Sequence, residues 1–101
     1  MDSDCVTGTA TNPDRATPPG VYQLWSKERD VVLRGSDYAA PVSFWMYFTE
    51  CGIGLHDYRR SAYGGDIYLR NGSHGCINLP YDFASDLFEA TDINIPVLVI
   101  P

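Results

Sequence analysis

Two histidines and one cysteine are the residues of this chain best suited to nucleophilic chemistry. The segment 71–80, NGSHGCINLP, places His74 two residues before Cys76, and His56 lies further upstream. A cysteine thiol is mostly protonated at neutral pH, so a nucleophilic cysteine needs a base within reach, and an imidazole is such a base. Cys76 is therefore a candidate nucleophile, and either histidine is a candidate base.

The residues around Cys76 have types that suit a catalytic turn. Gly75 lets the backbone approach a substrate and lets nearby N–H groups point into a site, as an oxyanion hole requires. Ser73 can hydrogen-bond locally and hold the turn. Asn78 would lie on the same face as Cys76 in an extended segment, where its amide would brace the loop or orient an imidazole. On spacing alone, Asn78 is equally well explained as a turn residue before the helix.

Three other roles for the cysteines are possible on the sequence alone: zinc ligation, a disulfide and inert buried thiols. His56, His74, Cys76 and Cys51 are ligand types that suit zinc, but the closely paired CxxC spacing of structural zinc sites is absent from this sequence. The count of three cysteines leaves at least one thiol free unless it pairs with another chain. A disulfide between Cys5 and Cys51 is one alternative, and inert buried thiols are the other. We expect no metal and no other cofactor.

Length and composition indicate one folded domain spanning residues 1–101. The chain is 45% hydrophobic and carries a formal net charge of -6, with its seven Lys and Arg residues scattered. This composition argues against a disordered segment and against a nucleic-acid partner. No apolar run approaches the roughly 20 residues that span a bilayer. The opening residues, MDSDCVTGTA, also lack the basic and then apolar pattern of a signal peptide.

Most of the chain has the β-branched and aromatic content of strands, which predicts a mainly β fold with one or two short helices. We expect strands at 5–10, 21–27, 30–35, 41–48, 52–56 and 96–100, with a hairpin turn at 27–29. We expect one helix that begins at Pro80 and ends near Thr91, with Phe83, Leu87 and Ala90 on its apolar face. Residues 57–72 are predicted to form a surface loop that contains at most one helical turn. This loop is a candidate wall of the site.

The motif also carries a family resemblance. His56, then sixteen residues, then Ser73-His74-Gly75-Cys76-Ile77-Asn78, resembles the signature of the L,D-transpeptidase catalytic domain, the YkuD-type family. The stretches TPPGVYQL and GIGLHD are similar to family segments that flank the site, so the resemblance covers nearly the whole chain. It implies a YkuD-like β-sandwich. Family domains usually open with one or two further strands, so we expect an N-terminally truncated domain whose unpaired sheet edge invites dimerisation.

The resemblance implies a function as well. Cys76 would be the nucleophile, His56 its base, and the backbone carbonyl of Asp57 would orient the imidazole, while His74 and Gly75 shape the oxyanion region. The enzyme would attack a peptidoglycan tetrapeptide stem, release a terminal D-amino acid and pass the acyl group from a thioester to an amine acceptor. L,D-carboxypeptidase hydrolysis of the same bond is the alternative, followed by a non-catalytic peptidoglycan-binding module. Such an enzyme of cell-wall biogenesis acts outside the cytoplasm.

Substrate-binding candidates come from the motif and from aromatic and basic residues near it. They are Ser73, Asn78, Tyr47, Tyr58 and Arg59, with Trp45 beside them and Arg60 or Arg70 as further partners for stem-peptide carboxylates. For any single one of the aromatics or arginines, core packing or a solvated surface position is the simpler interpretation.

Overall fold

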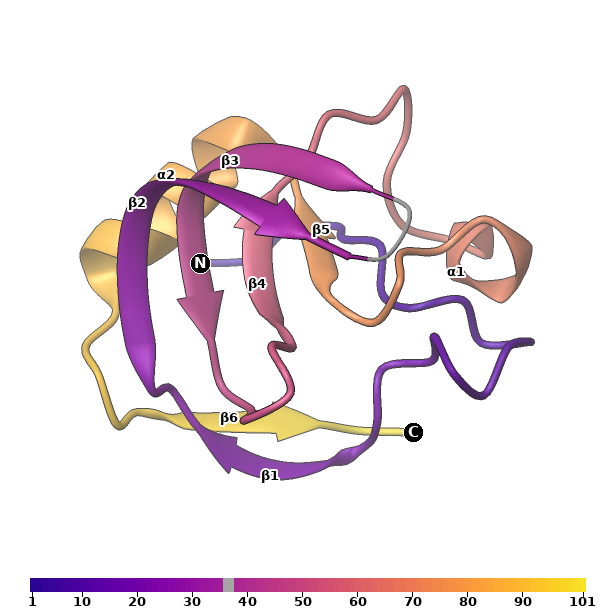
Figure 1. The fold of residues 1–101 in the computed structure, drawn as a ribbon, viewed down its shortest axis with the longest axis horizontal. Helices are drawn as coiled ribbons and strands as arrows, with labels where there is room; N and C mark the ends of the chain where they lie inside the picture. The colour runs from indigo at the N-terminus through magenta and orange to yellow at the C-terminus, as the bar shows by residue number, and fades with distance from the viewer. Residues whose placement is uncertain (36–37) are drawn as a thin grey trace.

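The computed structural model describes residues 1–35 and 38–101 of the chain. Its elements are β1 (Gly20–Gln23), β2 (Ser26–Arg34), β3 (Ala39–Tyr47), β4 (Gly54–Asp57), α1 (Ile67–Arg70), β5 (Ile77–Leu79), α2 (Tyr81–Ala90) and β6 (Pro96–Val99) (Figure 1). The expectation of a mainly β fold with two short helices is confirmed. Within the described part of the chain, neither helix is long and apolar enough to cross a membrane.

Four strands form the larger sheet in the order β2-β3-β4-β5. The first three are antiparallel, whereas β5 runs parallel to β4. The register pairs His56 with Trp45 on one side and with Asn78 on the other. His56 therefore occupies the middle of the sheet, flanked by strands that fix its position.

One apolar cluster joins the larger sheet to α2 and to the second sheet, the antiparallel pair β1 and β6. In Figure 1, α2 lies against the larger sheet and the β1–β6 pair runs across the lower ends of β3 and β4. The buried members of the cluster are Leu24, Phe44, Met46, Phe48, Ile77, Leu79, Ala84 and Phe88. Because Ile77 and Leu79 belong to β5, core packing holds the strand that follows Cys76.

The predicted hairpin turn at 27–29 is wrong, because β2 runs straight through these residues. The chain instead passes from the smaller sheet to the larger sheet between β1 and β2, at Leu24 and Trp25. The Leu24 N–H donates to the carbonyl of Ile95, before β6 (3.0 Å), and the Trp25 N–H donates to Tyr47 at the end of β3 (2.9 Å). The charged run that suggested a turn is tolerated in β2 because β2 is an edge strand, where charged side chains are common.

The expected strand at residues 5–10 is present only as two isolated bridges, Val6 with Asn78 and Gly8 with Ser73. Val6 donates to the Asn78 carbonyl (2.9 Å) and the Asn78 N–H donates back to Val6 (2.7 Å). The N-terminal segment thus covers part of the free edge of β5, a short strand that the sequence analysis did not predict. Pairing of a second copy with another sheet edge stays a prediction.

Helix α2 matches the prediction closely, with two differences at its ends. Pro80 is the N-cap, with an extended ψ of 146°, rather than the first helical residue. The helix ends as expected, with the Thr91 N–H donating to the Leu87 carbonyl (3.1 Å). Ala84 and Phe88 are its buried residues, whereas Ala90, which was expected on the apolar face, is exposed.

Candidate active site

The parallel pairing of β4 and β5 brings His56 and the segment that carries Cys76 to one cavity. His56 lies directly opposite Asn78 in β5, and Cys76 lies in the bend that immediately precedes β5, two residues before Asn78. All three residues line one cavity of about 700 Å³, as does His74. The histidine that is distant in sequence therefore shares a cavity with the cysteine.

The His56 imidazole is buried, with 5% of the residue exposed, and both of its ring nitrogens have neighbours. Nδ1 lies 2.8 Å from the backbone carbonyl oxygen of Asp57, and Nε2 lies 3.5 Å from the side-chain nitrogen of Asn78. Burial lowers the pKa of His56 below 6.5, and the carbonyl and negative charge of Asp57 only partly oppose this shift. The ring is therefore neutral at neutral pH, the form that can accept a proton.

The Cys76 thiol rests in its protonated form. Burial raises the pKa of Cys76 above 9.0, and the neighbouring Cys51 acts in the same direction, while a backbone hydrogen bond from Gly54 opposes them. The thiol donates to the Gly52 carbonyl at 3.5 Å. Because the thiol and the imidazole in this cavity are both neutral, nucleophilic attack requires transfer of the thiol proton.

The turn before Cys76 is closed by Ser73. Its hydroxyl donates to the Cys76 carbonyl and accepts the Gly75 N–H at 3.2 Å. Gly75 has a φ of 133°, in a region that favours glycine. Ser73 therefore holds the turn as its type suggested, and the Gly75 N–H is engaged within the turn.

A second segment, residues 6–17, braces this turn from outside. The Thr17 hydroxyl donates to the Gly75 carbonyl at 2.6 Å and accepts the Gly8 N–H at 2.8 Å. The Thr9 N–H donates to the Ser73 carbonyl at 3.1 Å. Sequence reasoning did not identify these contacts, although Thr17 belongs to the TPPGVYQL stretch that carried part of the resemblance.

Tyr58, Arg59 and His74 line the cavity, as does Arg60. The Tyr58 ring meets the His56 ring edge to face, with centroids 6.2 Å apart. His74 is exposed and packs against Tyr38, with ring centroids 4.9 Å apart. Tyr38 follows the end of β2 and no sequence signal indicated it.

Tyr47 does not line this cavity. Its ring packs against Trp45, with centroids 5.7 Å apart, and against Trp25, at 6.5 Å. Trp45 is a buried core residue whose ring also contacts His56, at 5.7 Å. The aromatic residues at the end of β3 therefore support the sheet beneath His56.

The proposed zinc ligands do not gather into one cluster. Among the described residues, no group of three or more His, Cys, Asp or Glu side chains is placed to hold a metal ion. His56 and His74 are directed to different partners, the Asp57 carbonyl and the Tyr38 ring. All three cysteines, which lie in described segments, are free, so the Cys5–Cys51 disulfide is not formed.

The family profile and the similar proteins found by comparison identify the same family. The profile of the L,D-transpeptidase catalytic domain, YkuD, matches residues 1–99. The probable L,D-transpeptidase 3 of Mycobacterium tuberculosis is 33% identical over 99 residues, which cover 86% of this chain and 35% of that protein. L,D-transpeptidase 1 of the same organism is 34% identical over 98 residues, covering 87% of this chain and 38% of that protein. The chain thus spans little more than a third of the length of these relatives.

Solved structures agree with the sequence matches. A crystal structure of a mutant L,D-transpeptidase from Enterococcus faecium superposes with a TM-score of 0.91 at 38% identity, covering 99% of this chain and 41% of that one. The NMR structure of the catalytic domain from E. faecium L,D-transpeptidase acylated by ertapenem has a TM-score of 0.82 at 40% identity, covering 99% of this chain and 80% of that one. The expected sandwich fold is confirmed by these similarities.

Proposed function

This chain belongs to the L,D-transpeptidase catalytic domain family, and from that premise we propose that residues 1–101 form a catalytic domain that cross-links peptidoglycan stem peptides through Cys76. One observation carries the proposal. The buried, neutral His56 shares a cavity with the only cysteine that lines this cavity among the described residues. This shared cavity supports Cys76 as the nucleophile and His56 as its base.

In the first half of the reaction, Nε2 of His56 accepts the Cys76 thiol proton as the sulfur attacks the carbonyl before the terminal D-residue of the tetrapeptide. The N–H of Cys76 stabilises the oxyanion that forms on this carbonyl, in the turn shaped by His74 and Gly75. The C–N bond then breaks. His56 returns its proton to the departing amine, so the D-amino acid leaves and an acyl-thioester remains on Cys76.

In the second half, the amine of an acceptor stem attacks the thioester carbonyl. Neutral His56 takes the proton from this amine and delivers it to the Cys76 sulfur as the thioester bond breaks. The cross-link is released and the thiol is restored. Water in place of the amine gives the L,D-carboxypeptidase outcome.

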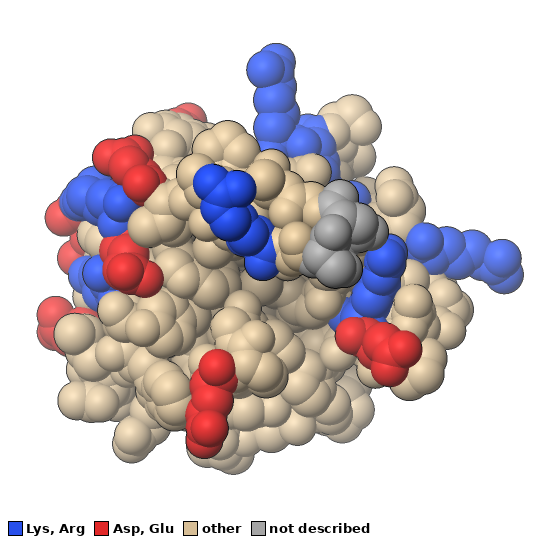
Figure 2. Space-filling view, in the orientation of Figure 1, with Lys and Arg blue, Asp and Glu red and all other residues tan. Residues whose placement is uncertain are grey.

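The charge around the cavity supports a stem peptide that carries carboxylates. Arg59 and Arg60 line the cavity, although the whole chain has a net charge of -6. In Figure 2, basic side chains stand at the upper edge and on the right-hand side of the molecule, near α1, and a further basic group lies among acidic residues at the left. Arg59 is exposed and would meet a carboxylate at the cavity mouth, with Tyr58, Ser73 and Asn78 forming the adjacent walls. Action on peptidoglycan implies a location outside the cytoplasm, at the cell wall.

Acylation of the whole chain by ertapenem tests the nucleophile. Intact-mass spectrometry is expected to show one adduct on the wild-type protein and none on Cys76→Ala. Cys51→Ala, which removes an exposed thiol outside the cavity lining, is the matched control and is expected to acylate. An adduct that persists in Cys76→Ala would refute the assignment.

Products from a disaccharide-tetrapeptide, with and without an acceptor amine, then separate transpeptidation from hydrolysis, since only the former gives a cross-linked dimer.

A further inference from the structure

The peptide unit between Gly75 and Cys76 is held by one side chain, that of Thr17. The Thr17 hydroxyl donates to the Gly75 carbonyl oxygen at 2.6 Å and accepts the Gly8 N–H at 2.8 Å. Because the Gly8 N–H uses the hydroxyl as an acceptor, the hydroxyl proton is left for Gly75. Within residues 1–35 and 38–101, Thr17 is the only hydrogen-bond partner that the protein gives this peptide unit.

The sequence makes Thr17 a stiff support. Its side chain is β-branched, which restricts χ1, and the following Pro18 confines its backbone to extended conformations. Gly8 makes the second contact possible, because a Cβ atom there would lie 1.8 Å from the Arg15 carbonyl oxygen and 2.8 Å from the Thr17 nitrogen. Only glycine lets the two backbone segments approach this closely.

Ser73 fixes the neighbouring peptide units but not this one. Its hydroxyl contacts the Gly75 N–H and the Cys76 carbonyl, which belong to the units on either side. A peptide unit between two fixed neighbours can still flip when ψ of one residue and φ of the next change together, the change that separates type I from type II turns. Gly75, with a φ of 133° and no side chain, offers little steric resistance to a flip. The orientation of this unit therefore depends on Thr17.

This orientation decides where the Cys76 N–H points. In a trans peptide the carbonyl and the N–H lie on opposite sides, so the anchored Gly75 carbonyl directs the Cys76 N–H away from Thr17. In the described part of the chain, Cys76 lines the cavity, whereas Thr17 and Gly75 do not. Thr17 thus holds the turn from behind, and the N–H is directed to the side from which a substrate would arrive.

We propose that Thr17 is a positioning residue that aims the Cys76 N–H at the oxyanion by holding the Gly75 carbonyl. The role in catalysis rests on the proposed function, whereas the hold on the carbonyl does not. Without the hydroxyl the peptide unit is free to flip, and the Gly75 carbonyl oxygen would then face the position where negative charge develops. An attractive contact with the oxyanion would be replaced by a repulsive one.

Thr17→Val tests this hold, since it keeps the branched shape and removes the hydroxyl. With no substrate present, the 13C shift of the Gly75 carbonyl and the 1H–15N shifts of the Cys76 amide are expected to change in the full chain. Thr17→Ser, which keeps the hydroxyl, is expected to restore both. Thr91→Val is the matched control, because Thr91 is likewise half-buried and donates its hydroxyl to the Leu87 carbonyl at 2.8 Å, at the end of α2 and outside the cavity lining.

Acylation by ertapenem separates a positioning role from a merely structural one. In Thr17→Val the rate constant of acylation is expected to fall about 10- to 100-fold, because the Cys76 N–H is misaligned rather than deleted. The constant for the preceding reversible binding should stay unchanged, because Thr17 does not line the cavity. Thr17→Ser and Thr91→Val are both expected to acylate at close to the wild-type rate.

The proposal would be overturned by an unchanged Gly75 carbonyl shift in Thr17→Val, or by a loss of rate that Thr17→Ser does not reverse. Equal losses in Thr17→Val and Thr91→Val would also overturn it, since they would report general destabilisation. Thr17→Ala is a second variant without the hydroxyl, to which the same outcomes apply if Thr17→Val does not fold. If the wild-type chain is not acylated at all, the proposed function fails, and the carbonyl shift still decides whether Thr17 holds this peptide unit.

Discussion

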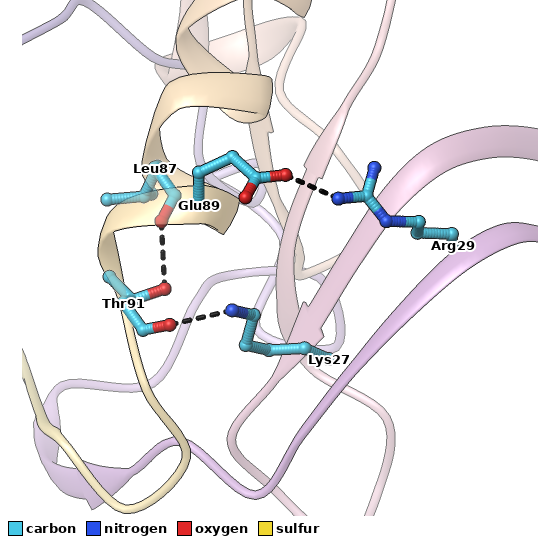
Figure 3. A network of polar contacts seen from close by, with 5 residues as sticks. All are labelled: Lys27, Arg29, Leu87, Glu89 and Thr91. Atoms are coloured by element: carbon cyan, nitrogen blue, oxygen red, sulfur yellow. Dashed lines mark hydrogen bonds and ion pairs between the residues drawn. The ribbon is translucent and has the colours of Figure 1, made fainter.

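The strands that carry the site and the bridge from β2 to α2 use similar polar groups in different surroundings. In the site strands, β3 to β5, the Asp57 carboxylate accepts the backbone N–H groups of Ser43 (2.9 Å) and Phe44 (2.8 Å). In the β2–α2 bridge, Arg29 pairs with Glu89 and the Lys27 ammonium donates to the Thr91 carbonyl at 2.7 Å (Figure 3).

The two regions differ in exposure. The side chains of Arg29 and Glu89 are 52% and 67% exposed, so water competes for both charges and the pair is expected to contribute little. His56 and Asn78 are almost fully buried. A buried polar group that loses its hydrogen-bond partner still bears the free-energy cost of its desolvation. Burial, more than formal charge, should therefore decide which polar contacts matter for stability and function.

The largest effect on stability is expected from Asp57→Ala. This change removes the carboxylate that accepts two β3 N–H groups next to the site and leaves both groups without a hydrogen-bond partner. The free energy of unfolding should fall by about 2–4 kcal/mol. Urea unfolding would measure this loss. Asp57→Asn keeps one acceptor oxygen and should lose about half as much. A loss no greater than that of Glu89→Ala would contradict the contrast between the two regions.

Much of the site follows from the sequence because its information is local. The turn from Ser73 to Cys76 needs a hydroxyl at its start and a glycine at its third position, and the Ser73 hydroxyl closes it as the sequence indicated. Helix α2 was predicted from its apolar period, and β3 from its continuous apolar run. Each signal is contained within about ten residues of chain.

What the sequence could not reveal depends on partners that are distant along the chain. The charged run in β2 resembles a turn unless one knows that it pairs with β3 at a sheet edge. Arg60 resembles a substrate contact unless one knows that Asn78 lies within 3.0 Å. Tyr47 resembles a groove residue until the packing of Trp25 and Trp45 shows otherwise. No local pattern specifies any of these pairings.

A smaller effect is expected from the pH dependence of stability. Because burial lowers the pKa of His56 in the folded state, the unfolded chain binds more protons between the folded pKa and 6.5. The His56 contribution to stability is therefore full above pH 6.5, falls as the pH drops through this window and levels off below the folded pKa. Urea unfolding of the wild type and His56→Gln from pH 7.5 downward would measure the difference. Parallel stability curves would show that burial does not penalise the charged ring.

The smallest effect is expected in the β2–α2 bridge. Arg29→Met keeps a long apolar side chain to cover the Phe88 ring, over which the guanidinium now lies at 4.5 Å, and removes only the charge. Paired with Glu89→Gln in a double-mutant cycle, it should give a coupling energy under about 1 kcal/mol. This coupling should shrink further in high salt because both side chains are exposed. A coupling well above this value that survives high salt would mean that the bridge behaves like the buried site strands, and exposure would no longer account for the difference between the two regions.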